Sequence, residues 1–91
     1  MIRSFADRDT EQIYNGERSR KLPPNIQRSA QHKLRILSNA ATPETLKVPP
    51  GNHFEALNAR PGFYSIRINR QWRITFSWKN GAENVKIEDY H

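Results

Sequence analysis

Arg67 and Arg73 lie in neighbouring segments of alternating polar and apolar residues, a spacing that can place two guanidinium groups side by side. If the two segments pair as antiparallel strands through a three-residue turn at 69–71, Ile66 lies opposite Ile74 and Arg67 opposite Arg73. Two like charges in this position repel each other unless an anion lies between them. The planar guanidinium fork can hold two phosphate oxygens, so the spacing predicts a phosphate-binding site.

The last segment of the sequence brings further polar groups to this face. A second hairpin, closed at Asn80-Gly81, places Glu88 opposite Arg73, where a carboxylate could instead neutralise the arginines in an ordinary surface ion network. Asp89, Tyr90 and His91 follow, so a phenol and an imidazole are expected beside the arginine pair. Imidazole transfers protons readily near neutral pH, and tyrosine can donate a proton or stack on a base. The alternative interpretation of this ending is a frayed terminus without a role.

These residue types match the cleavage of RNA without a metal. That reaction requires a base for the ribose 2′-hydroxyl, cations to stabilise the phosphorane, and an acid for the leaving 5′-oxygen. Histidine, tyrosine and arginine supply these groups. The sequence contains no cysteine, which excludes a disulfide framework and a thiolate metal site. We expect no metal and no cofactor.

The charge of the chain also favours a polyanionic partner. Fifteen Lys and Arg residues against nine Asp and Glu give a net charge of +6. The stretch from Ala56 to Ala82 has no acidic residue and contains five of the cations. They are Arg60, Arg67, Arg70, Arg73 and Lys79. We expect Arg60, Arg70 and Lys79 to bind RNA; the alternatives are a nucleic-acid-binding module without catalysis and unspecific basicity.

Two helices are expected before the sheet. Asp7 or Asp9 can cap a short helix that ends near Asn15 and Gly16, and the polar segment 17–22 reads as an exposed, mobile connector. The pair Pro23-Pro24 opens a second helix, whose apolar residues recur at the spacing of a buried stripe: Ile26, Ala30, Leu34 and Leu37. Its other face reads as a solvated surface, with Arg28, His32, Lys33 and Arg35.

Alternating segments predict a mainly antiparallel sheet. They are 63–69, 72–78 and the region around Val85 and Ile87, and residues 1–5 can form a first strand. Asn80-Gly81 is typical of a two-residue type I′ hairpin, which would pair Phe76 with Val85, Ile74 with Ile87 and Arg73 with Glu88. The segment 39–50, with its prolines, reads as a loop.

The length of 91 residues predicts one domain over residues 1–91. We expect a cytoplasmic protein, because the sequence has no cysteine, no signal peptide and no apolar stretch long enough to span a membrane.

Three stretches resemble one known family. PPGNHFEAL, SIRINRQWRITF and the final VKIEDYH are similar to the HigB-type (plasmid maintenance system killer) toxins of the RelE/ParE superfamily. The resemblance implies a compact α+β fold with two N-terminal helices packed on a mainly antiparallel twisted sheet. It also implies the toxin of a type II toxin–antitoxin system. Such toxins are ribosome-dependent endoribonucleases that cleave messenger RNA in the A site by metal-independent 2′-hydroxyl attack.

The family motifs also imply roles for individual residues. Arg73 would stabilise the phosphate in the transition state, and Arg67 would support it or grip the message. Asn69 would position RNA. The terminal catalytic cluster would consist of Asp89, Tyr90 and His91.

One departure concerns the loop that often reads Gly-Asn-Arg-Leu-Glu in relatives. Here it carries His53 and Phe54, so a titratable group replaces a fixed cation. His53 would then bind phosphate more weakly or act as a second acid–base group. The alternative is a partly exposed histidine that packs beside Phe54.

The resemblance implies partners as well: a HigA-type helix-turn-helix antitoxin, the 70S ribosome with its messenger RNA, and operator DNA contacted through the antitoxin. The rival interpretation is a non-enzymatic toxin of the same fold that poisons DNA gyrase or another protein, as ParE-type toxins do.

Overall fold

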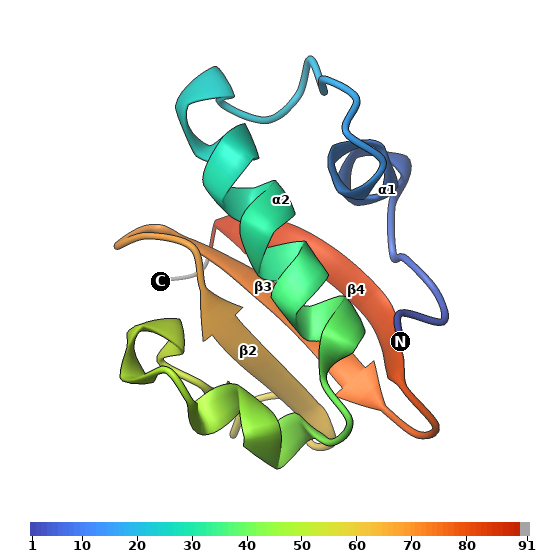
Figure 1. Ribbon diagram of the computed structural model, residues 1–91, viewed down its shortest axis with the longest axis vertical. Helices are drawn as coiled ribbons and strands as arrows, with labels where there is room; N and C mark the ends of the chain where they lie inside the picture. The colour runs from blue at the N-terminus through green and yellow to red at the C-terminus, as the bar shows by residue number, and fades with distance from the viewer. Residues whose placement is uncertain (90–91) are drawn as a thin grey trace.

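The computed structural model describes residues 1–89, so the predicted site residues Tyr90 and His91 lie outside the described part of the chain. Two α-helices and two short 3-10 helices precede a four-stranded antiparallel sheet of order β1-β2-β3-β4 (Figure 1). The helices are α1 (Arg8–Tyr14), α2 (Pro24–Asn39), η1 (Pro43–Lys47) and η2 (Pro50–Asn52). The strands are β1 (Glu55–Ala56), β2 (Phe63–Arg67), β3 (Trp72–Trp78) and β4 (Ala82–Asp89). The predicted α+β class is confirmed.

The boundaries of α1 follow from its capping residues. The Asp7 carboxylate accepts a hydrogen bond from the Thr10 N–H at 2.9 Å, which satisfies one of the free donors of the first turn. The helix ends at Tyr14 with Asn15 as its C-cap, and Gly16 follows with a φ of +83°, a conformation that glycine adopts without steric cost. The predicted short helix is confirmed.

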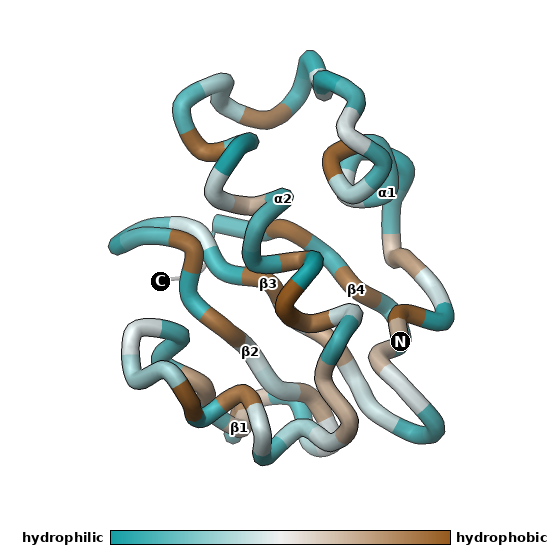
Figure 2. The backbone as a smooth tube through the Cα atoms, viewed as in Figure 1, coloured by the Kyte–Doolittle hydropathy of each residue, from teal (hydrophilic) through white to brown (hydrophobic). Residues whose placement is uncertain are grey.

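The second helix, α2, covers one face of the sheet. It begins at Pro24, and its buried stripe is the predicted one: Ile26, Ala30, Leu34 and Leu37. Figure 1 shows α2 lying across the sheet, and Figure 2 shows apolar segments in α2 and in the strands behind it. The stripe packs with residues from three strands in one core, Ile66, Ile74, Phe76, Val85 and Ile87. The sheet therefore has one face under α2 and one face left for polar groups.

The predicted register between β2 and β3 is confirmed. Ile66 lies opposite Ile74, and Arg67 lies opposite Arg73. Asn69 stabilises the turn, because its side-chain oxygen accepts hydrogen bonds from the N–H groups of Gln71 and Trp72 at 2.8 Å each. This turn fixes the two arginines on the same face.

The turn between β3 and β4 differs from the predicted two-residue hairpin. Trp78 pairs with Ala82, so residues 79–81 form a three-residue connection. An irregularity between Thr75 and Ser77 then shifts the register by one residue, and the predicted pair of Phe76 with Val85 does not form. Beyond the shift, the other predicted pairs do form, Ile74 with Ile87 and Arg73 with Glu88.

Gly81 shows why the type I′ prediction was wrong. Its φ is +142°, and a Cβ atom at this position would lie 2.8 Å from the carbonyl oxygen of Met1. The N-terminal segment crosses here: the Ala82 N–H donates to the Met1 carbonyl and the Arg3 N–H to the Ala82 carbonyl. The glycine is required by this close approach, which local turn rules do not include.

Two further predictions need correction. Residues 1–5 form no continuous strand; instead, Ile2 and Phe5 make single parallel bridges to Ala82 and Val85 of β4. The connector 17–22 is not simply exposed, because Ser19 is buried. The Ser19 hydroxyl donates to Asp9 at 2.7 Å, and Gln27 of α2 binds both the N–H and the carbonyl of Ser19.

None of the helices within residues 1–89 is long and apolar enough to span a membrane.

Candidate active site

The face of the sheet opposite α2 carries Arg67 and Arg73, and we call it the arginine face. Two rows of side chains cross it in register. One row consists of Arg67, Arg73 and Glu88, and the next consists of Glu55, Ser65, Thr75 and Lys86. A long side chain in one row can reach a residue in the adjacent row, so contacts on this face also run diagonally between the two rows.

Arg73 lies at the centre of the arginine face and is held on three sides. Its side chain is 14% exposed and forms a salt bridge with Glu55 at 3.0 Å. One Nη also donates to the Ser65 hydroxyl and to the backbone carbonyl of His53, each at 3.2 Å. A guanidinium fixed in this way loses little side-chain entropy when it binds a further anion.

Arg67 is the predicted neighbour of Arg73, and it contacts His53. Its Nε donates to the Asn69 carbonyl at 2.9 Å, and its Nη1 lies 3.3 Å from Nε2 of His53. Because a guanidinium can only donate, Nε2 can take part in this contact only as the acceptor. An unprotonated Nε2 is the form that a general base needs. His53 is exposed and therefore accessible to a substrate.

Glu88 does not neutralise the arginine pair in the way that the alternative interpretation supposed. Its two oxygens bind the guanidinium of Arg60 at 2.8 and 3.2 Å, and it also accepts a hydrogen bond from the Thr75 hydroxyl. The carboxylate that pairs with Arg73 is Glu55. The charge of Arg67 is thus left beside the imidazole of His53 and not beside a carboxylate, and the face keeps its cationic character.

The Glu88 carboxyl group predicts a dependence of stability on pH. Burial raises the pKa of Glu88, but hydrogen bonds from Arg60 and Thr75 and the charges of Arg60 and Lys86 lower it, and the net pKa lies below its ordinary value. A depressed pKa in the folded state stabilises the protein above the unfolded-state pKa, and this stability is lost as the pH falls through the folded-state pKa. We expect the free energy of unfolding to decrease below about pH 4.5.

Glu88→Gln is expected to lower the stability at pH 7 by about 1 kcal/mol, and its difference from the wild type should be smaller at pH 3. Urea unfolding at both pH values measures the difference. Glu83→Gln, on the same strand and face, is the matched control. The difference in unfolding free energy between Glu83→Gln and the wild type should not shrink from pH 7 to pH 3 as it does for Glu88→Gln. An equal gap at pH 3 and pH 7 for Glu88→Gln would contradict the assignment.

The remaining predicted residues lie at different distances from Arg73. Asn69 uses its side-chain oxygen inside the β2–β3 turn, and Arg70 is exposed on the same turn. The Asp89 side chain accepts a hydrogen bond from Gln71 at 2.8 Å, which places it beside this turn. Lys79 lies past the other end of β3, six residues and roughly 20 Å along the strand from Arg73. Lys79 is therefore not brought into the cluster.

Sequence reasoning missed the anionic and hydroxyl partners of the arginines. Glu55 belongs to β1, a strand of only two residues, which is too short to show an alternating pattern. Ser65 and Thr75 are buried on the arginine face even though their positions in the alternating pattern suggested exposed polar residues. The long side chains of Arg73 and Glu88 cover them through the hydrogen bonds already described.

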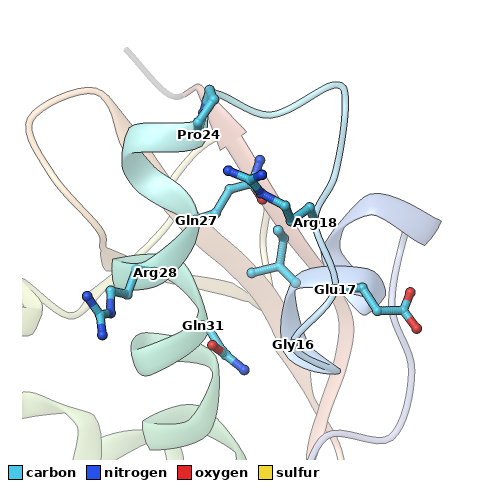
Figure 3. A pocket seen from close by; sticks show the side chains of 8 residues that line it. Gly16, Glu17, Arg18, Pro24, Gln27, Arg28 and Gln31 are labelled. Atoms are coloured by element: carbon cyan, nitrogen blue, oxygen red, sulfur yellow. The ribbon is translucent and has the colours of Figure 1, made fainter.

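Other possible sites are separate from this cluster. Residues 1–89 contain no group of three or more His, Asp or Glu side chains arranged to hold a metal ion. An open pocket of about 220 Å³ lies on the helical side of the protein, between the connector and α2 (Figure 3). Its lining includes Arg18, Gln27 and Gln31. The pocket shares no residue with the arginine face.

Comparison with known proteins places the chain in a family. A family model described as the RelE-like toxin of the type II toxin–antitoxin system HigB matches residues 3–91. Toxin HigB-1 of Vibrio cholerae is 40% identical over 93 residues, which cover 100% of this chain and 98% of that protein. An uncharacterised protein of Haemophilus influenzae is 32% identical over 77 residues, or 84% of this chain and 76% of that protein.

The family match agrees with the α+β fold and with the motifs that frame the arginine face. A type II toxin is one half of a toxin–antitoxin pair, so membership implies an antitoxin partner. The chain therefore belongs to the HigB-like family of RelE-like toxins from type II toxin–antitoxin systems.

Proposed function

We propose that this toxin is a ribosome-dependent endoribonuclease that cleaves messenger RNA in the A site by 2′-hydroxyl attack without a metal. The observation that carries the proposal is the position of the His53 imidazole, 3.3 Å from Arg67 and on the same face as Arg73. A proton acceptor beside two permanent cations matches the requirements of RNA cleavage. Membership of the HigB-like toxins supports the same activity.

In the proposed reaction the 2′-oxygen attacks the adjacent phosphorus, and the bond from phosphorus to the 5′-oxygen breaks. The proton of the 2′-hydroxyl goes to a base, for which Nε2 of His53 is the candidate among the described residues once the Arg67 guanidinium turns from its lone pair to a phosphate oxygen. Arg73 stabilises the negative charge of the phosphorane, and Arg67 holds a phosphate oxygen. Tyr90 and His91 are the candidates for protonating the leaving 5′-oxygen, with Asp89 orienting one of them. The products are a 2′,3′-cyclic phosphate and a 5′-hydroxyl.

Glu55 takes part in this proposal as a displaceable counter-ion. Its carboxylate binds Arg73 at 3.0 Å and is half exposed, whereas Arg73 is almost covered. A substrate phosphate can replace the carboxylate on the guanidinium, because both anions fit the same fork. The exchange keeps Arg73 neutralised in both states and avoids an unpaired charge before the substrate binds.

Further residues are proposed to hold the message and the partners. Asn69 and Arg70 lie on the β2–β3 turn, Arg60 lies beside Glu88, and Lys79 would contact RNA further along the strand. The proposed antitoxin is of the HigA type, with a helix-turn-helix domain through which the complex contacts operator DNA. The ribosome supplies the message in the A site.

The test is primer extension on a translated message in a reconstituted translation system. Discrete cuts within codons are expected with the wild type when ribosomes translate, and a variant that lacks His91 should lose them. The same message without ribosomes, and a message without a start codon, are the controls and should remain intact. A wild-type protein that blocks growth but cuts nothing would contradict the proposal and favour gyrase or another protein target.

A further inference from the structure

A buried amide lies next to the candidate base. Asn52 is 0% exposed, and its Nδ2 donates to the carbonyls of Leu46 at 3.1 Å and Val48 at 3.5 Å. Its Oδ1 accepts a hydrogen bond from Nζ of Lys33 at 2.7 Å. Both polar ends of the amide are thus satisfied, as burial requires. These bonds tie the segment from η1 to η2 to the helix α2.

Lys33 is not part of the solvated helix face predicted from the sequence. It is half buried, and burial lowers the pKa of its ammonium group. Desolvation of a charge is unfavourable, so the bond to Asn52 offsets part of that cost. The contact joins residues 19 positions apart, one on α2 and one at the end of η2. Lys33 therefore connects the core helix to the loop that carries His53.

His53, the residue after Asn52, has a constrained backbone. Its φ of 44° and ψ of 50° lie in the left-handed region, which is unfavourable for a residue other than glycine. Its N–H donates to the Pro50 carbonyl at 3.0 Å. On its other side, the ring of Phe54 stacks on Tyr64 with centroids 5.5 Å apart. A conformation of this kind persists where flanking contacts determine it, and such sites are often functional.

We propose that Lys33 and Asn52 are positioning residues that hold His53 for catalysis. The inference rests on the proposed function, because it assigns the pair to the same site. The fixed backbone sets two features at once: the imidazole beside Arg67 and the carbonyl that accepts from Arg73. A small displacement of His53 would misplace a proton acceptor and release one contact of the central arginine.

The first test measures the position of the loop without reference to activity. Lys33→Met keeps the aliphatic stem and leaves Oδ1 of Asn52 buried without its donor. We expect amide hydrogen exchange at Asn52 and His53, whose N–H groups bind the Pro49 and Pro50 carbonyls, to become about tenfold faster. Lys47→Met removes an exposed lysine from η1 and should leave these rates unchanged. Unchanged exchange in Lys33→Met would overturn the inference.

The second test connects the pair to catalysis through a double-mutant cycle. Lys33→Met should lower kcat by about ten- to a hundredfold with KM within about twofold, and Lys33→Arg should recover most of the loss. In a His53→Ala background, Lys33→Met should cause a much smaller loss, because the imidazole is gone and only the contact of the residue-53 carbonyl with Arg73 remains to be displaced. If the losses of kcat in Lys33→Met and in His53→Ala multiplied in full in the double variant, the positioning role of Lys33 would be overturned.

A wild type that cleaves no message in any condition would instead overturn the proposed function. The exchange rates would then still decide whether Lys33 anchors the loop. The two failures are therefore distinguishable.

Discussion

Replacement of Arg73 by alanine is expected to slow message cleavage by about 10²–10³-fold while the protein remains folded. Arg73 lies at the centre of the arginine face, where Glu55, Ser65 and the His53 carbonyl fix its guanidinium. A preorganised cation stabilises the charge that develops on the phosphorane, and alanine removes that charge. Rates of cleavage in the translation system, together with thermal unfolding of the variant, measure the two effects separately.

Two further variants make the Arg73 result specific. Arg73→Lys keeps one positive charge but loses the planar fork, so it should recover only part of the rate. Arg28→Ala removes an equal charge from the exposed side of α2 and should cleave as the wild type does. If Arg73→Ala cleaved within about threefold of the wild type, Arg73 would have no role in the transition state.

The largest effect on stability is expected for Phe76→Ala, which should lower the free energy of unfolding by about 3–5 kcal/mol. Phe76 is the largest of the fully buried side chains and lies in the core between the sheet and α2. Its ring contacts Tyr64 and Trp78, with centroids 5.8 and 6.5 Å away. A protein of this size has a net stability of only about 5–15 kcal/mol, so the loss is a large fraction of the total.

Thermal unfolding measures this loss, which corresponds to a decrease of roughly 12–40 °C in Tm. Phe76→Leu fills most of the space and should cost no more than about 1.5 kcal/mol. A Tm for Phe76→Ala within a few degrees of the wild type would show that the core is packed differently around β3.

The sequence predicted those parts of the fold that depend on local patterns. The boundaries of α1 and the start of α2 follow from Asp7, Gly16 and Pro24, and the pairing of Arg67 with Arg73 follows from alternation and one turn length. The β3–β4 turn was predicted wrongly, because the residue that determines it, Met1, lies 80 positions away from Gly81. Propensity rules do not include such a distant partner.

For the candidate site as well, the sequence predicted only the residues that lie in a periodic pattern. The arginine pair has a periodic signal, whereas its carboxylate Glu55 lies in a two-residue strand that has none. Lys33 has the helical spacing of a solvated face, and only the return of the chain over α2 brings Asn52 to it. The site is thus assembled from one feature that is local in sequence and several that require the complete tertiary structure.

The pairing of the N-terminal segment with β4 has a consequence for how the protein folds. The Asn84 N–H donates to the Ser4 hydroxyl across 80 residues of sequence, and the Ile87 N–H donates to Thr10 across 77. Contacts of such high sequence separation form slowly, since a long loop must close first. During synthesis, residues 2–10 must wait until residues 82–87 have been made. Because Glu88 also belongs to β4, the arginine face is completed only late in synthesis, and a nascent chain does not carry it.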